Sequence, residues 1–173
     1  MIVLLCGRSF SGKSTVAEVL ARQLPATAVS LDAINAERGL HGGQGIPIEE
    51  WSRTNGVARD RTRRCIAAGV TVVVDDTSSP RFLRDGWRAL ADEQGVSLVL
   101  VHIDTPIEVS LQWHRTNRDN PLRDDVDDAV MRAHLESFEP PGGDEKVIRF
   151  GPGASDVTDL VAALRLRVGT SDA

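Results

Sequence analysis

The sequence has few aromatic residues and no excess of positive charge. Only 4% of the 173 residues are aromatic and none is Tyr, so a platform for stacking single-stranded bases would depend on three Trp and four Phe. The formal net charge of -5 provides no overall basic footprint for nucleic acid. Apolar runs are too short to span a membrane. We therefore expect one cytoplasmic domain, residues 1–173, with no membrane partner.

Cysteine is also scarce. Cys6 lies in the first apolar run and Cys65 in a helical pattern, without a spacing that suggests a pair. Both are predicted to be small buried residues in a reducing compartment, rather than metal ligands or redox groups. The run "IVLLC" directly follows Met1 without a basic segment, so it is interpreted as a core strand and not as a signal peptide.

Short apolar runs alternate with helical patterns along the chain. The predicted strands cover residues 2–6, 27–31, 70–74, 96–103 and 146–150. The predicted helices cover residues 13–24, 47–68, 80–94, 126–138 and 156–168, and a further one begins near residue 106. This alternation indicates a three-layer α/β domain with parallel strands. In such sheets, ligands bind at the carboxyl ends of the strands.

Several helix boundaries carry their own signals. Ser79 is predicted to cap a helix whose first residue is Pro80. "TPIE" at residues 105–108 fits a capping box with proline at the first helical position. The segment "NAERGLHGGQGIPIEE", residues 35–50, contains four glycines and a proline and is predicted to be a loop.

The strongest motif is "GRSFSGKS", residues 7–14, which fits G-x-x-x-x-G-K-[ST] between a strand and a helix. Its glycines allow backbone N–H groups to approach phosphate oxygens, and the helix N-terminus adds partial positive charge. Lys13 is expected to reach the β- and γ-phosphates, and the Ser14 hydroxyl to ligate Mg²⁺. The predicted ATP-binding residues are Gly7, Ser9, Ser11, Gly12, Lys13, Ser14 and Thr15.

Carboxylates follow two further strands. Asp75 is predicted to orient Mg²⁺ or its waters, whereas the adjacent Asp76 is interpreted as a turn residue, and the choice between them stays open. Asp32 follows the second strand, where it could accept the proton of an acceptor hydroxyl. The structural alternative for Asp32 is an N-cap of a helix that begins at Ala33.

Arginines form two groups. Arg115 and Arg118 lie one helical turn apart and precede a charged stretch, so a lid over residues 115–128 is predicted in which they neutralise charge on the transferred phosphoryl group. The alternative is a solvated helix face. Arg123 is a weaker candidate for the same lid. The second group, Arg59, Arg61, Arg63 and Arg64, is expected mostly to face solvent, with one or two members able to contact an anionic acceptor.

Taken with "VSLDAI", "VVVDDTSSPRFLRDGW" and "HIDTPIEVSLQWHRTNR", the phosphate loop resembles the small P-loop kinase family over nearly the whole chain. Relatives include chloramphenicol phosphotransferase, gluconate kinase, the kinase domain of polynucleotide kinases and zeta-toxin-like AAA-type proteins. The resemblance implies a five-stranded parallel sheet of order 2-3-1-4-5, with Asp32 as base, Asp75, Thr77 and Arg84 in the third-strand segment, and Arg115 and Arg118 in the lid.

The resemblance implies an ATP·Mg²⁺ phosphotransferase acting on a hydroxyl of a small molecule such as a sugar, nucleoside or antibiotic. One alternative is a kinase of polynucleotide 5′-hydroxyls or of charged tRNA, which the acidic net charge and the lack of Tyr disfavour mildly. Another is a nucleotide-dependent switch that hydrolyses ATP without an acceptor. The segment after Asp32 matches no acceptor signature, and Asn35 stands where polynucleotide kinases often carry Arg. The sequence therefore predicts neither the acceptor nor the oligomeric state.

Overall fold

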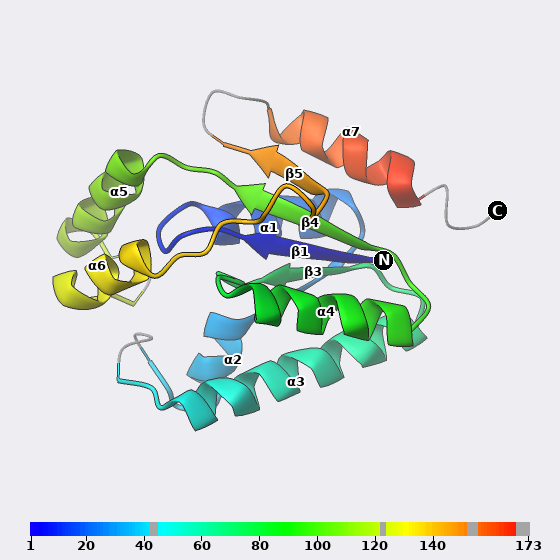
Figure 1. Cartoon of the computed structure of the whole chain (residues 1–173), viewed down its shortest axis with the longest axis horizontal. Coiled ribbons are helices and arrows are strands. Elements are labelled where there is room, and N and C mark those ends of the chain that lie inside the picture. The colour runs from blue at the N-terminus through cyan, green and yellow to red at the C-terminus, as the bar shows by residue number, and fades with distance from the viewer. Residues whose placement is uncertain (42–44, 122–123, 152–155, 169–173) are drawn as a thin grey trace.

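The computed structural model describes residues 1–41, 45–121, 124–151 and 156–168 (Figure 1). Its strands are β1 (Ile2–Cys6), β2 (Thr27–Ser30), β3 (Val72–Asp75), β4 (Leu98–Ile103) and β5 (Val147–Phe150). Its helices are α1 (Lys13–Gln23), α2 (Leu31–Glu37), α3 (Ile48–Ala67), α4 (Arg81–Glu93), α5 (Ile107–Asp119), α6 (Asp128–Glu136) and α7 (Val157–Val168). No helix in this described part is long and apolar enough to cross a membrane.

The strands form one parallel sheet in the order β2-β3-β1-β4-β5. This confirms the predicted α/β class and strand order. β1 is central and pairs with β3 through Ile2 opposite Val72 and with β4 through Ile2 opposite Leu98. The loops that follow β1, β2 and β3 therefore emerge at one edge of the sheet, where the site lies.

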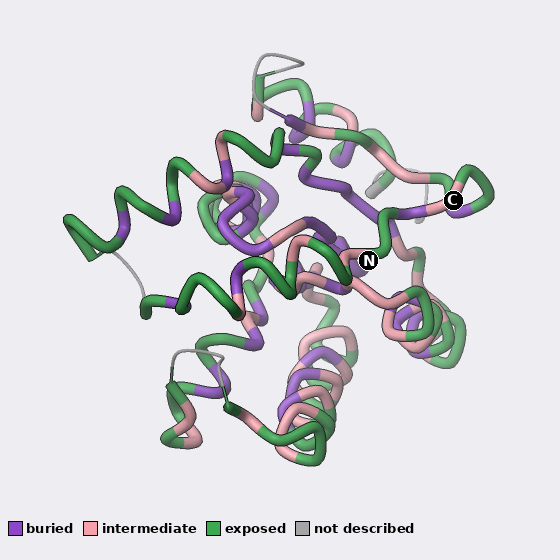
Figure 2. The backbone as a smooth tube through the Cα atoms, turned by 60° about the vertical axis from the view of Figure 1, so that its left-hand side comes forward, coloured by how far each residue is buried: buried purple, intermediate pink, exposed green. Residues whose placement is uncertain are grey.

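Alternate residues of the central strand enter two separate cores. Ile2, Leu4 and Cys6 pack with residues of α3 and α4, including Ala58 and Trp87. The intervening β1 residues pack with α1 and α7 on the other face. Figure 2 shows buried positions concentrated in the strands and on the inner sides of the helices. Such two-sided burial explains why the strands are almost continuously apolar.

The two cysteines lie on the same side of the sheet. Cys6 is fully buried, and burial raises the pKa of its thiol to about 12. Cys65 is partly buried and packs against the core, and both cysteines are free. The thiol of Cys6 therefore stays protonated at neutral pH and behaves as a small core group.

Two predicted helix caps are wrong. The N-caps of α4 and α5 are Pro80 and Pro106, and neither makes a side-chain capping bond. The Ser79 hydroxyl instead accepts a hydrogen bond from the Glu139 N–H at 3.1 Å. Thr105 donates its hydroxyl to the Ser11 carbonyl at 2.7 Å. Both side chains thus satisfy groups in distant segments, which sequence patterns for helix starts do not reveal.

The second strand also ends earlier than predicted. β2 stops at Ser30, whose hydroxyl accepts a hydrogen bond from the Ala33 N–H at 3.3 Å and caps α2. Asp32 is therefore a first-turn residue of α2, and its interpretation as the cap is wrong. The predicted loop over residues 35–50 is helical at both ends, and residues 42–44 of it lie outside the described residues.

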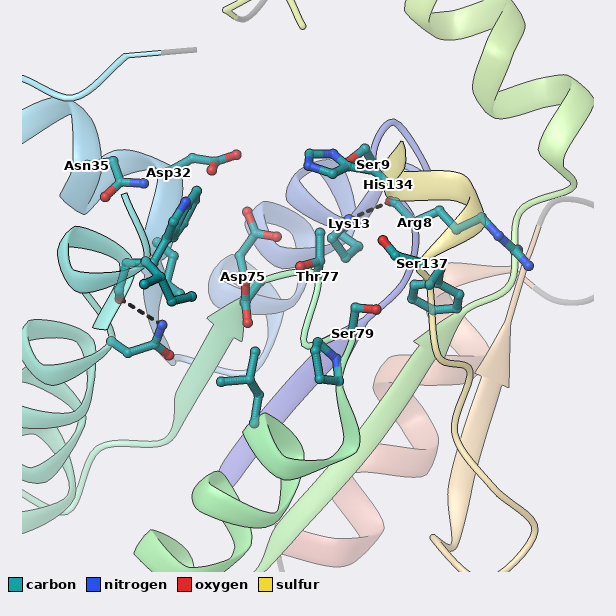
Figure 3. Close-up of a pocket in the computed structure, with 18 of the residues that line it drawn as sticks. Arg8, Ser9, Lys13, Asp32, Asn35, Asp75, Thr77, Ser79, His134 and Ser137 are labelled. Carbon is teal, nitrogen blue, oxygen red and sulfur yellow. Dashed lines mark hydrogen bonds between the residues drawn. The ribbon is translucent and has the colours of Figure 1, made fainter. Parts of the chain in front are cut away.

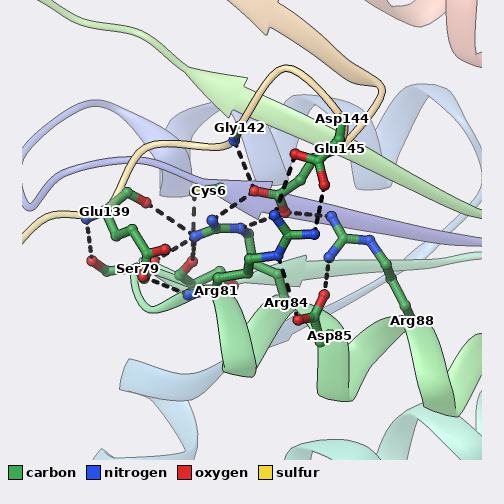
Figure 4. Close-up of polar contacts among 11 residues, drawn as sticks. Cys6, Ser79, Arg81, Arg84, Asp85, Arg88, Glu139, Gly142, Asp144 and Glu145 are labelled. Carbon is green, nitrogen blue, oxygen red and sulfur yellow. Dashed lines mark hydrogen bonds and ion pairs between the residues drawn. The ribbon is translucent and has the colours of Figure 1, made fainter.

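A buried arginine connects two chain segments near the site through hydrogen bonds (Figure 4). Arg84 is 0% exposed, and its Nε and Nη2 donate to the Glu145 carboxylate at 2.9 and 2.8 Å. Its Nη1 donates to the carbonyls of Ser78 and Glu139 at 2.9 and 3.0 Å. Arg84 therefore links the β3–α4 turn to the segment before β5. It is a structural residue of this fold, not a group that faces the cleft.

Candidate active site

A cleft of about 850 Å³ opens at the carboxyl ends of β1, β2 and β3 (Figure 3). Its walls come from the loop after β1, from α2 and α3, from the turn between β3 and α4, and from α6. The predicted residues Ser9, Lys13, Ser14, Asp32 and Asp75 all line this one cleft. The fold thus brings together side chains that are far apart in the sequence.

The loop between β1 and α1 needs glycine at both ends. Gly12 is the N-cap of α1 and has a φ of 89°, in the left-handed region that side chains disfavour. A Cβ on Gly7 would lie 2.8 Å from the Ile103 carbonyl oxygen and 2.9 Å from the Ser11 Oγ. The hydrogen bond from Thr105 to Ser11 holds the same loop from β4's side. The backbone of the β1–α1 loop is therefore held close to Ile103 and Thr105 at the end of β4.

Lys13 and the following residues stand at the first turn of α1. Lys13 is 8% exposed and its ammonium donates to the Arg8 carbonyl at 2.7 Å, across the loop. Ser14 and Thr15 are exposed, but only Ser14 lines the cleft. The Ser11 Oγ is buried and has no hydrogen-bond partner within the described residues. The N-terminus of α1 can therefore offer the Lys13 ammonium and the serine hydroxyls to a bound phosphate chain.

The two adjacent carboxylates at the end of β3, Asp75 and Asp76, have different surroundings. Asp75 shares the strand face of Val73, which packs in the core beneath α1, so Asp75 is directed toward the side of the sheet that carries Ser14. Asp76 accepts hydrogen bonds from both the N–H and the hydroxyl of Ser78 at 3.0 Å. Burial raises the pKa of Asp76, although the bonds from Ser78 oppose that rise. Asp76 therefore forms the turn.

The described residues contain no group of three His, Cys, Asp or Glu side chains that could enclose a metal by themselves. A divalent cation in this cleft would depend on the Ser14 hydroxyl, the Asp75 carboxylate and oxygens of a bound phosphate chain. That donor set is all oxygen, which suits Mg²⁺.

The arginines predicted for the lid do not line the cleft. Arg118 forms ion pairs with Asp125 at 3.1 Å and Asp128 at 2.8 Å, and it donates to the Val126 carbonyl. Arg115 is exposed and makes no hydrogen bond or ion pair with the described residues. Arg123 lies outside them. The structure therefore does not bring Arg115 or Arg118 together with Lys13, and a role for them needs a movement of α5 or α6.

Other cleft residues were missed by the sequence analysis. His134 of α6 lies 2.9 Å from the Ser9 Oγ through its Nδ1, and burial, reinforced by the Lys13 ammonium, lowers its pKa. Arg8 places its guanidinium 4.9 Å from the centre of the Phe138 ring. Arg8 stands inside the loop motif and could have been considered. His134 and Phe138 carry no local signal, because they reach the loop only through the fold.

Comparisons with known proteins agree with this architecture. A family model described as an AAA domain matches residues 2–141. Chaetomium thermophilum Kti12 in complex with ADP-AlF3 has a TM-score of 0.80 and 10% identity, covering 95% of this chain and 97% of that one. A putative kinase from Chloroflexus aurantiacus has a TM-score of 0.76 and 15% identity, covering 98% and 96%.

A third solved structure is a complex with two bound molecules. The Mycobacterium tuberculosis APS kinase CysC in complex with AMPPNP and APS has a TM-score of 0.69 and 17% identity, and the match covers 94% of each chain. A comparison with curated proteins finds no match. At these identities the solved structures show a shared fold, while the activity has to be argued from the cleft itself.

Proposed function

Because the chain belongs to the AAA-domain family of P-loop proteins, we propose that it is a kinase that moves the γ-phosphoryl group of ATP to a hydroxyl of a small molecule. One observation carries the proposal: Asp32 of α2 lines the same cleft as Lys13 and Ser14 of α1. An ATPase without an acceptor needs no carboxylate opposite the phosphate loop, whereas a kinase uses one to align a hydroxyl.

The proposed nucleotide end consists of the loop amides and α1. The N–H groups after Gly7 and the N-terminus of α1 would hold the β- and γ-phosphates. Lys13 would leave the Arg8 carbonyl, 2.7 Å from its ammonium, and contact the same phosphates. Ser14 and Asp75 would hold Mg²⁺, which neutralises charge on the transferred group. The contact with the phosphates would be charge-assisted, which strengthens hydrogen bonds from the Lys13 ammonium.

The proposed acceptor end begins at Asp32. Its carboxylate would accept the proton of the acceptor hydroxyl as that oxygen attacks the γ-phosphorus in line with the leaving ADP. Asp32 is exposed at the first turn of α2, so a substrate can reach it from the cleft. The Ser30 cap, through its hydrogen bond from the Ala33 N–H, fixes the backbone of this first turn.

The test is to incubate the protein with labelled ATP and separate panels of metabolites, antibiotics and oligonucleotides. Label in a small-molecule pool supports the proposal. Salt-sensitive label in the oligonucleotides would instead indicate a polynucleotide kinase. Release of labelled phosphate alone, together with nucleotide-dependent binding of another protein, would indicate a switch and contradict the proposal.

A further inference from the structure

The part of the cleft between α2, α3 and α4 is lined by residues whose buried polar atoms lack partners. Asn35 Nδ2, Asn55 Oδ1 and Arg59 Nε are buried and have no hydrogen-bond partner in the part of the chain that the structure describes. All three residues line the cleft, and Figure 3 shows Asn35 beside Asp32. Buried polar atoms without partners are costly, so their occurrence together in one cavity indicates a ligand that satisfies them.

The Asn35 amide is held in one orientation. Asn35 is 2% exposed, and its Oδ1 accepts the hydroxyl proton of Thr54. Thr54 must donate in that direction because Arg38 Nη1 donates to its oxygen at 2.6 Å. The Nδ2 of Asn35 is therefore left as a fixed donor at the cleft wall.

Asn55 offers a hydrogen-bond acceptor, whereas Asn35 offers a donor. Its Nδ2 donates to the Trp51 carbonyl at 3.0 Å, which orients the amide and leaves Oδ1 as an acceptor. The two amides thus offer one donor and one acceptor, from α2 and α3 respectively.

Arg59 is the member of the arginine group on α3 that lines the cleft. Arg61 pairs with Glu37 and Arg63 with Asp60, whereas Arg59 has no ion pair with any described residue. Its guanidinium lies 5.7 Å from the Trp87 ring centre. A Cβ on Gly86 would come within 2.3 Å of its Nη2, so the missing side chain makes room for it. A half-buried guanidinium without a carboxylate is suited to bind one from a ligand.

We propose that this part of the cleft binds a small hydroxy carboxylate as the phosphoryl acceptor. The inference deepens the proposed function and rests on it. The carboxylate accepts from Asn35 and Arg59, and a neighbouring O–H or N–H donates to Asn55. The carbon skeleton packs on Trp51 and Leu83, which also line the cleft. One donor pair, one acceptor and apolar walls fit a compact anion better than a neutral polyol or a nucleic-acid strand.

The transfer is balanced as follows. The acceptor oxygen forms a bond to the γ-phosphorus, and its proton passes to the Asp32 carboxylate. The bond between the γ-phosphorus and the β,γ-bridging oxygen breaks, and ADP leaves with that electron pair. The acceptor's carboxylate is not altered, so it serves only for recognition.

The test uses matched pairs that differ only in the acid group: gluconate with sorbitol, mandelate with 1-phenyl-1,2-ethanediol, and 3-hydroxybutyrate with 1,3-butanediol. Binding is measured by calorimetry with AMPPNP and Mg²⁺ present, and transfer by label from ATP. We expect at least one carboxylate to bind about tenfold or more tightly than its neutral partner. Equal or absent binding in every pair overturns the inference.

Variants assign the preference to the named residues. Arg59→Gln and the isosteric Asn35→Asp should each remove the preference for the acid, while Arg63→Gln on the same helix should keep it. Asn35→Asp keeps an oxygen that accepts the hydroxyl proton of Thr54. It therefore provides a second, independent test of the preference if Arg59→Gln does not fold. A preference that survives both variants overturns the inference. Carboxylate binding without label transfer would support the carboxylate site but contradict the proposed kinase activity. Transfer to neutral alcohols alone would support the kinase activity and overturn the carboxylate site.

Discussion

Ser9 and His134 meet in the cleft, with 2.9 Å between the serine Oγ and the histidine Nδ1, although 125 residues separate them. The contact joins α6 to the phosphate loop. Burial lowers the pKa of His134, and the nearby Lys13 ammonium lowers it further. The neutral imidazole is therefore the form that the folded protein favours, which makes this contact sensitive to acid.

The first prediction concerns pH. Since the folded-state pKa of His134 is below its usual value of about 6.5, the unfolded chain takes up the proton first, and stability is lost as pH falls through that value. His134→Gln should therefore lose less stability than the wild type between pH 7.5 and pH 5.5, measured by urea unfolding. The control is His41→Gln, at an exposed position, which should follow the wild type. Identical pH dependence in all three proteins would contradict the prediction.

The second prediction concerns Asp32. Asp32→Asn should fold and bind ATP but transfer the phosphoryl group about 10²- to 10⁴-fold more slowly, because the hydroxyl loses its proton acceptor. Steady-state transfer to the acceptor and ATP binding by calorimetry measure the two effects. Glu37→Gln, on the same helix, provides the control and should retain the rate. Undiminished transfer by Asp32→Asn would remove Asp32 from the mechanism.

The third prediction concerns the support of the phosphate loop. Thr105→Val keeps the side-chain volume but removes the hydroxyl that donates to the buried Ser11 carbonyl. The unpaired carbonyl should cost about 1–3 kcal/mol of unfolding free energy and weaken ATP binding. Chemical denaturation and nucleotide titration measure these losses, and Thr116→Val on the exposed side of α5 is the matched control. Wild-type values for both quantities in Thr105→Val would show that the bond does not support the loop.

The fourth prediction concerns the buried network in Figure 4. Glu145→Gln leaves Arg84 without its carboxylate and should lower the unfolding free energy by about 3 kcal/mol at pH 7. The pKa of Glu145 is lowered to about 2, chiefly by its hydrogen bonds from Arg84, so this stabilisation is present above about pH 4.5 and is lost as pH falls toward 2.

The neighbouring Asp144 is the control for that network. It is exposed and pairs with Arg81 at 2.6 Å, so Asp144→Asn should lower the unfolding free energy far less than Glu145→Gln does. Urea unfolding at pH 7 compares the two variants. Equal losses would mean that burial does not distinguish the two ion pairs.

Local patterns predicted much of the fold. The apolar runs and helical periodicity identified the strands and helices, and the family resemblance supplied the strand order that the structure shows. Boundaries were less well predicted. Ser30 caps α2, whereas Ser79 and Thr105, both with capping potential, bond to Glu139 and Ser11 instead. A hydroxyl near a helix start has several available partners, and only the packing of distant segments selects one.

The sequence by itself determined the phosphate loop, because its glycines, Lys13 and Ser14 act through a backbone turn that a short contiguous segment encodes. It also indicated Asp32 and Asp75, since strand ends meet at one edge of a parallel sheet. Only the tertiary structure decided that Arg84 is buried with Glu145, that Arg118 pairs with Asp125, and that Arg59 turns into the cleft. An arginine's partner depends on which distant carboxylate the fold brings near it, and no local pattern records that distance.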